Sequence, residues 1–156
     1  MLPSPESLKE TLQAQLPGIG LSIEGEGFGV EVKDWVSVCR YLKTAPALEL
    51  DYLSDLTAVD YPPDRIEVVC HLYSMKQKHG PLTLRVKLNR AHPVVDSVTA
   101  VWRSAEFQER EVYDLFGVTF THHPDLRRIL MWDGFEGYPM RKDYVVEDQD
   151  VLEKPA

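Results

Sequence analysis

Acidic, basic and aromatic side chains are interleaved in one short stretch of this chain, from Glu109 to Gly117. If the stretch is a helix, Glu109, Tyr113 and Phe116 share one face, because their spacing is i, i+4 and i+7. Burial of Phe116 then draws Glu109 toward the interior, where a carboxylate needs arginine or backbone donors. The arginines that follow it are Arg127, Arg128 and Arg141. These residue types predict buried ion pairing.

The segment 125–144, called the arm below, is rich in Arg, Pro, Gly and aromatic residues and has little periodicity. One interpretation is that it folds back on the helix through Arg–carboxylate pairs and turns its large apolar side chains outward. Interface cores have this aromatic, Met and Arg composition. The other interpretation is that the same side chains close the domain's own core, and periodicity alone favours neither. The side chains concerned are Trp132, Phe135, Tyr138 and Met140.

The remaining chemistry-bearing residues form no recognisable site. The glycines make neither a dinucleotide fingerprint nor a phosphate loop. His122 and His123 are adjacent, so on extended chain they point to opposite faces and cannot chelate one ion. Cys39 and Cys70 are too few for an iron–sulfur cluster or a structural zinc, and we expect buried free thiols. We therefore expect no catalytic, cofactor-binding or metal-binding residue in this chain.

Composition excludes several other classes. The 156 residues carry 17 Lys+Arg and 25 Asp+Glu, a net charge of −8, which disfavours a bulk electrostatic grip on nucleic acid. No apolar run approaches the ~18–20 residues that span a bilayer, and the first residues do not resemble a secretory signal. We expect the protein on the cytosolic side, unless a partner holds it at a membrane.

Hydrophobic periodicity gives the elements that would position these residues. Leucines spaced by four predict a helix between Ser4, its cap, and Pro17. A hairpin around residues 25–27 follows, and then a helix that Asp34 would cap. Strand-like alternation covers 48–59, 66–73 and 82–88, and a short extended piece covers 118–120.

The stretch with the interleaved charges has the signals of a third helix, over 104–116. We expect Ser104 as the N-cap and Gly117 as the C-cap, and Arg110 is spaced i, i+4 from both Glu106 and Asp114, as in charge pairs along a helix. The fold class is then α+β: two N-terminal helices on a mostly antiparallel or mixed sheet, one further helix and a long irregular C-terminal arm. We expect one domain over 1–144 and an acidic tail over 145–156.

Several ordered motifs resemble the signature of the thirty-kilodalton subunit (the C subunit) of respiratory complex I, the NADH:quinone oxidoreductase. They are Glu109–Gly117 (EREVYDLFG), His123–Leu130 (HPDLRRIL) and Glu136–Tyr144 (EGYPMRKDY), with Leu53–Tyr61 (LSDLTAVDY) and Ser97–Thr99 (SVT) upstream. The resemblance runs from about residue 48 to 144, and its last third is highly specific. To its signature positions we assign structure and docking: Glu109, Arg110, Glu111, Tyr113, Asp114, His123, Pro124, Arg127, Arg128, Arg141, Lys142 and Asp143.

The resemblance implies a hydrophilic, cofactor-free subunit of a proton-translocating enzyme, with no active site of its own. Iron–sulfur clusters, FMN and quinone would belong to partner subunits. The expected partners are the subunit of the quinone pocket, which resembles the forty-nine-kilodalton subunit of complex I, and neighbouring iron–sulfur subunits. The expected location is the cytoplasmic face of a bacterial plasma membrane, where the complex holds the chain.

The sequence departs from the family pattern at a few positions. It has Ala100–Arg103 (AVWR) where the family has Asp-Ile/Val-Trp-Pro, and Phe107 where the family has Trp. His122 stands where a Gly is usual, and Tyr138 where a His is usual. These departures keep an alternative open: the equivalent subunit of a membrane-bound hydrogenase, a formate hydrogenlyase or an F420H2-type dehydrogenase. A third hypothesis is an independent enzyme that uses the Glu/Arg/His cluster.

Overall fold

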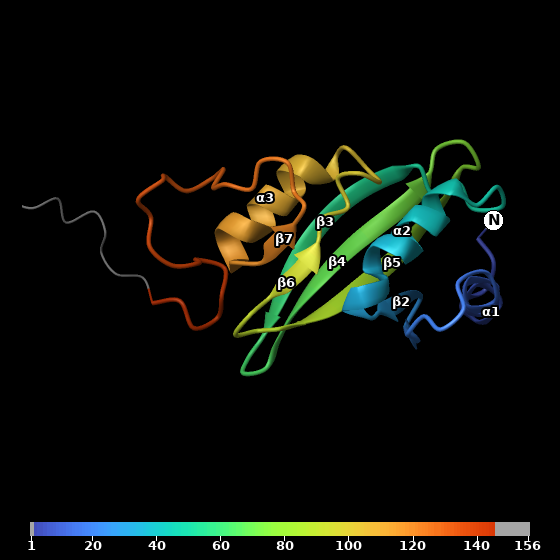
Figure 1. The fold of residues 1–156 in the computed structure, drawn as a ribbon, viewed down its shortest axis with the longest axis horizontal. Helices are drawn as coiled ribbons and strands as arrows, with labels where there is room; N and C mark the ends of the chain where they lie inside the picture. The colour runs from blue at the N-terminus through green and yellow to red at the C-terminus, as the bar shows by residue number, and fades with distance from the viewer. Residues whose placement is uncertain (1, 146–156) are drawn as a thin grey trace, which may run out of the picture.

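The computed structural model describes residues 2–145, so the expected acidic tail lies outside the described residues apart from Val145. Figure 1 shows the order of the elements along the chain. They are α1 (Pro5–Gln15), β1 (Leu21–Glu24), β2 (Gly27–Val30), the 3-10 turn η1 (Val32–Asp34), α2 (Trp35–Thr44), β3 (Tyr52–Tyr61), β4 (Arg65–Ser74), β5 (His79–Asn89), β6 (Val94–Asp96), α3 (Ala105–Phe116) and β7 (Thr119–Thr121). The arm follows β7 and occupies the end of the molecule away from α1 (Figure 1).

Two sheets confirm the α+β fold class. The larger has the order β1-β2-β5-β4-β3, in which β2 and β5 are parallel and the other neighbours antiparallel. The smaller pairs β6 with β7 in parallel, with Val95 opposite Phe120. Because β6 and β7 flank α3 in the sequence, their pairing brings the start of the arm back to the loop before α3.

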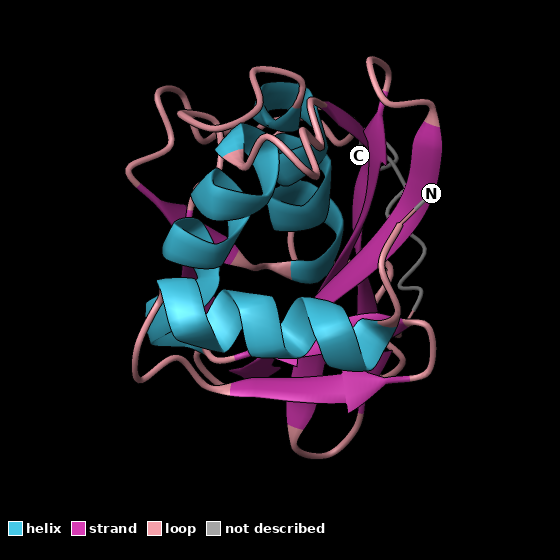
Figure 2. Cartoon of the chain, turned by 90° about the vertical axis from the view of Figure 1, so that its right-hand side faces the viewer, coloured by secondary structure: helices cyan, strands magenta, loops and turns pink. Residues whose placement is uncertain are grey.

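The helices gather on one side of the five-stranded sheet, as Figure 2 shows. Alternate residues of the central strands face them, so Val68, Cys70 and Val86 are fully buried. Leu8 and Leu12 of α1, and Trp35 and Val38 of α2, close the same core. Cys39 and Cys70 are buried free thiols, as expected.

The expected strand over 48–59 is wrong at its start, because β3 begins at Tyr52. Leu48 and Leu50 are buried, but the backbone still turns there after α2. The Leu48 amide donates to the Ala45 carbonyl at 2.9 Å, and the Leu50 amide to the Leu42 carbonyl at 3.0 Å. Alternation of apolar residues does not distinguish such a turn from a strand.

Two of the four predicted helix caps are confirmed. Ser4 caps α1 by accepting a hydrogen bond from the Ser7 amide, and Gly117 ends α3 with a φ of 73°. Asp34 precedes α2 but does not cap it, because its carboxylate accepts the Gly20 amide at 2.9 Å instead. Ser104 makes no capping bond either.

His122 holds a left-handed conformation, with a φ of 64°, and its side chain is exposed. A β-carbon is strained there, which gives a physical reason for the glycine expected at this position. We predict that His122→Gly raises the free energy of unfolding by about 0.5–1 kcal/mol. Urea denaturation measures it, with His92→Gly as the control, an exposed histidine outside the positive-φ region. A His122→Gly protein no more stable than wild type would refute this explanation.

Candidate functional site: the arm and its anchors

Asp114 on α3 is the main anchor of the arm. Its side chain is fully buried and accepts Arg128 Nη1 at 2.6 Å. It also accepts the backbone amides of residues 129, 130 and 131 at 3.0, 2.7 and 2.8 Å. Burial acts to raise the pKa of Asp114, but the Arg128 bond and the three amide bonds together outweigh burial and hold the pKa below its ordinary value. The predicted Arg–carboxylate pair between helix and arm therefore exists.

Arginines fix the path of the arm through its carbonyl groups. Arg110 donates to the carbonyls of Arg127 at 3.1 Å and of Arg128 at 2.9 Å. Arg141 reaches back to the Phe116 carbonyl at the end of α3, at 2.6 Å. The expected pairs of Arg110 with Glu106 and Asp114 along the helix are therefore wrong, because Arg110 turns to the arm instead.

A second anchor, which the sequence did not predict, holds the far end of the arm. Asp60 at the end of β3 accepts Arg90 Nε at 2.7 Å and the Lys142 amide at 2.8 Å. Arg90 also pairs with Asp143 at 2.7 Å. The hydrogen bond from Arg90 is the largest cause of the lowered pKa of Asp60. Asp60 and Asp143 both lie in the family motifs, which could have marked them as candidate site residues. Nothing in the sequence connected either of them with Arg90.

Glu109 is buried as expected, but no arginine among the described residues pairs with it. Its two oxygens accept the Ser97 hydroxyl at 2.6 Å and the Val98 amide at 2.7 Å. Arg127 is exposed and pairs with exposed Asp125 at 2.9 Å. The backbone can therefore meet the hydrogen-bonding need of a buried carboxyl group without a cation.

The other signature positions fall into two groups. The His123 ring is fully buried and lies 2.9 Å from the Glu106 carbonyl, and Tyr113 is half-buried. Glu111, Pro124 and Lys142 are exposed. Glu111 borders a hollow of about 270 Å³ between α3 and β3. The charged residues of the signature thus act mostly inside the chain.

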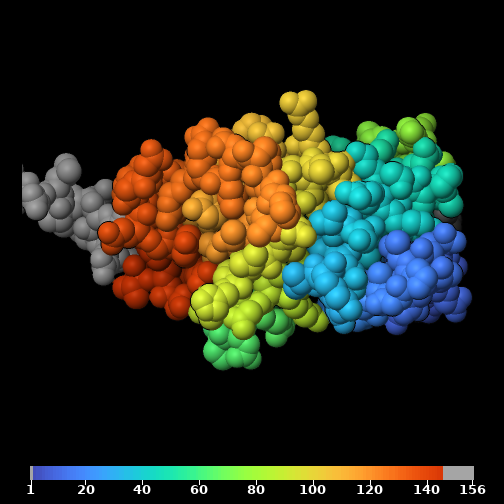
Figure 3. Space-filling model, viewed as in Figure 1, coloured from blue at the N-terminus to red at the C-terminus, as the bar shows by residue number. Residues whose placement is uncertain are grey.

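The arm keeps its large apolar side chains out of the core. Trp132 is 58% exposed, Met140 55% and Leu130 56%. Phe135 and Tyr138 are half-buried: the Phe135 and Trp132 rings meet edge-on with centroids 4.9 Å apart, and Tyr138 lies beside Arg141 and against Gly117 at the end of α3. None of these residues belongs to the hydrophobic core. The outward interpretation is therefore confirmed for Trp132 and Met140, which lie in the part of the chain that forms one end of the molecule (Figure 3).

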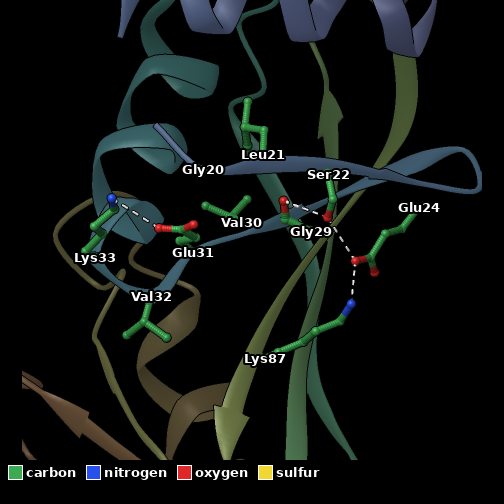
Figure 4. A pocket seen from close by; sticks show the side chains of 10 residues that line it. All are labelled: Gly20, Leu21, Ser22, Glu24, Gly29, Val30, Glu31, Val32, Lys33 and Lys87. Carbon is green, nitrogen blue, oxygen red and sulfur yellow. Dashed lines mark hydrogen bonds and ion pairs between the residues drawn. The ribbon is translucent and has the colours of Figure 1, made fainter. Parts of the chain in front are cut away.

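A hollow of about 590 Å³ lies by the β1–β2 hairpin and contains no signature residue. Figure 4 shows that its charged side chains are paired, Glu24 with Lys87 and Glu31 with Lys33. Within residues 2–145 no three His, Cys, Asp or Glu side chains gather as a metal site would require. No helix in this range is long and apolar enough to cross a bilayer.

Comparison with known proteins gives the family. The model of "Respiratory-chain NADH dehydrogenase, 30 Kd subunit" matches residues 28–150. A C subunit of the NADH-quinone oxidoreductase of Rhizobium meliloti is 50% identical over 120 residues, which are 75% of this chain and 64% of that relative. The chain thus spans somewhat less than two thirds of that relative's length. This chain belongs to the family of the thirty-kilodalton subunit of respiratory-chain NADH dehydrogenases.

Two solved structures share the fold. A trypsin-resistant fragment (1–134) of Nqo5 superposes with a TM-score of 0.61 and 33% identity, over 78% of this chain and 98% of the fragment. A chain of the membrane-bound sulfane sulfur reductase, an archaeal respiratory membrane complex, gives a TM-score of 0.73 at 22% identity. That match covers 97% of this chain and 94% of the other, and it shows the fold alone.

Proposed function

We propose that this chain is a hydrophilic subunit of a proton-translocating NADH:quinone oxidoreductase. It packs through its arm against the quinone-pocket subunit, the forty-nine-kilodalton type, and keeps that subunit and the neighbouring iron–sulfur subunits in register. The cofactors (FMN, iron–sulfur clusters and quinone) reside in those partners, and this chain holds none. The complex holds it peripherally at the cytoplasmic face of the membrane. Family membership supports the proposal.

The observation that carries the proposal is the exposed apolar surface of an arm that is anchored from within. Because Asp114, Arg110 and Arg128 are already bonded inside the chain, these three charges are not free for a partner, and the arm exposes the apolar side chains of Leu130, Trp132 and Met140. Such side chains are the usual energetic centre of a protein interface. An arm already held in its bound shape also loses less conformational entropy on docking.

The charges beside this apolar surface indicate the kind of partner surface that fits it. Asp133 and Glu136 follow Trp132 and Phe135 in the chain, are exposed, and form no ion pair with a described residue. An apolar pocket with a basic rim complements this arrangement. Anionic lipid does not, because it would repel both carboxylates.

Affinity purification of the tagged chain from its host tests the proposal. We predict that wild-type protein brings down oxidoreductase subunits that carry flavin and iron–sulfur clusters. Trp132→Ala should lower their recovery at least about 10-fold, the effect of losing an interface hot spot. Met75→Ala is the matched control, because Met75 is 65% exposed but lies in the turn before β5, far from the arm (Figure 1). Full recovery with Trp132→Ala would show that the arm is not the docking surface.

The identity of the recovered subunits separates this proposal from its alternative. The fold is shared with a chain of the sulfane sulfur reductase complex, so fold alone does not choose between relatives. Recovery of a hydrogenase, formate hydrogenlyase or F420H2-type partner would assign the chain to one of those complexes. Turnover by the purified chain without partners would instead support the independent enzyme.

A further inference from the structure

Glu109 is a carboxyl group in the core with no cation beside it. The residue is fully buried, and its polar contacts are the Ser97 hydroxyl at 2.6 Å and the Val98 amide at 2.7 Å. Two donors stabilise a carboxylate, whereas burial favours the neutral acid. The site therefore has no fixed charge that would determine the protonation state of Glu109.

Two titratable groups face Glu109 from other elements: His123, from the segment after β7, and Cys39, from α2. His123 Nε2 lies 3.9 Å from Glu109, too far for a hydrogen bond, and meets the Glu106 carbonyl at 2.9 Å. His123 Nδ1 accepts the Asp125 amide at 3.0 Å, so both ring nitrogens have backbone partners. From α2, Cys39 stays a thiol, because burial first, and then the charges of Cys70 and Glu109, raise its pKa.

Two hydroxyl groups connect Glu109 to the edge of the core. Ser97 Oγ lies 2.8 Å from Thr99 Oγ1, and Thr99 is half-buried in the loop between β6 and α3. When Glu109 is ionised, Thr99 donates to Ser97 and Ser97 donates to Glu109. When Glu109 is protonated, both bonds reverse direction, because a hydroxyl group both donates and accepts. The same three residues thus satisfy both protonation states.

We propose that Glu109 is a buried proton-binding site that exchanges its proton with solvent along the hydroxyl groups of Ser97 and Thr99. On release, the carboxyl proton passes to Ser97 Oγ, the Ser97 proton to Thr99 Oγ1, and the Thr99 proton to water. On uptake each transfer reverses, and the two hydroxyl groups end unchanged. The proposal concerns this chain alone and stands whether or not the proposed function is correct.

The protonation equilibrium of the site lies in the physiological range. Burial raises the pKa of Glu109 to about 7, against the weaker, lowering effects of the bonds from Ser97 and Val98. The site would therefore change its occupancy within the pH range of a cell interior.

Infrared spectroscopy of the full chain as a function of pH tests the proposal with the proton itself as the probe. Wild-type protein should show the carbonyl stretch of a buried protonated carboxyl group at about pH 6, lost by about pH 8. The band should be absent from Glu109→Gln. It should persist in Glu111→Gln, which removes an exposed carboxylate from the same helix. A wild-type spectrum without the band, or a band that survives in Glu109→Gln, would overturn the site.

Two further variants test the hydroxyl chain. Ser97→Ala removes a charge-assisted bond to the carboxylate and should move the midpoint to higher pH. Thr99→Val leaves the Ser97 hydroxyl without an acceptor when Glu109 is protonated, whereas Ser97 Oγ still accepts the Thr99 amide when Glu109 is ionised, so the midpoint should move to lower pH. Shifts of opposite sign support the chain. Unchanged midpoints, or shifts of the same sign, would refute it.

Discussion

Asp114→Ala should lower the free energy of unfolding by about 3–5 kcal/mol, the usual cost of removing one partner from a buried ion pair. The substitution leaves the largely buried Arg128 guanidinium without its carboxylate, and three backbone amides without their acceptor. Urea denaturation measures the loss. Amide hydrogen exchange at residues 129–131 should rise in parallel, because these amides bond directly to Asp114.

Asp125→Ala is the matched control for this experiment. It also removes an aspartate from an arginine pair, but Asp125 and Arg127 are both exposed, so we expect a change of at most about 1 kcal/mol. Equal effects of the two substitutions would show that the arm is not held through Asp114.

Glu109 should make the protein less stable as the pH rises through neutrality. Its pKa is raised from 4.5 to about 7 in the folded state, so the folded protein binds this proton more tightly than the unfolded chain. The resulting stabilisation is fully present below about pH 4.5 and is lost as the pH rises to about 7 and above. One pKa unit corresponds to about 1.4 kcal/mol, so a rise of about 2.5 units corresponds to a loss of about 3–3.5 kcal/mol.

Glu109→Gln isolates this effect, because glutamine resembles the protonated acid at every pH. Urea denaturation should find Glu109→Gln more stable than wild type by about 3 kcal/mol at about pH 8, and close to wild type at about pH 4.5. The two proteins must be compared at each pH, because the stability of both also changes for another reason. Asp114 and Asp60 have lowered pKa values and contribute stability that is lost as the pH falls. A constant difference between pH 4.5 and pH 8 would contradict the buried-acid interpretation.

The anchors give the signature residues a shared physical role. Asp114 binds the start of the arm and Asp60 its end, and the Met140 amide reaches the Leu115 carbonyl between them. An irregular segment lacks the repeating bonds of a helix or sheet, so side chains must satisfy its backbone groups. This explains why charged residues such as Arg128 and Arg141 bond to backbone groups in a segment that also exposes Trp132 and Met140.

The amino-acid sequence by itself determined the local structure and the family. Leucine spacing and the Ser4 cap specify α1, and Gly117 specifies the end of α3, because helix periodicity and left-handed backbone are encoded by near neighbours. The motifs between Glu109 and Tyr144 were enough to recognise the family. The need of Glu109 for hydrogen-bond donors followed from its position on the same helix face as Phe116.

Only the tertiary structure decided which groups met. Arg128, not Arg127, pairs with Asp114. Glu109 accepts hydrogen bonds from a serine hydroxyl and a backbone amide just after β6, and the sequence pattern did not predict that strand. Arg90 joins Asp60 to Asp143, two residues that lie far apart in the chain. Such partners are selected by the pairing of β6 with β7 and by the return of the arm to the sheet. These are long-range contacts, and the periodicity of a sequence reports only the orientation of each residue within its own element.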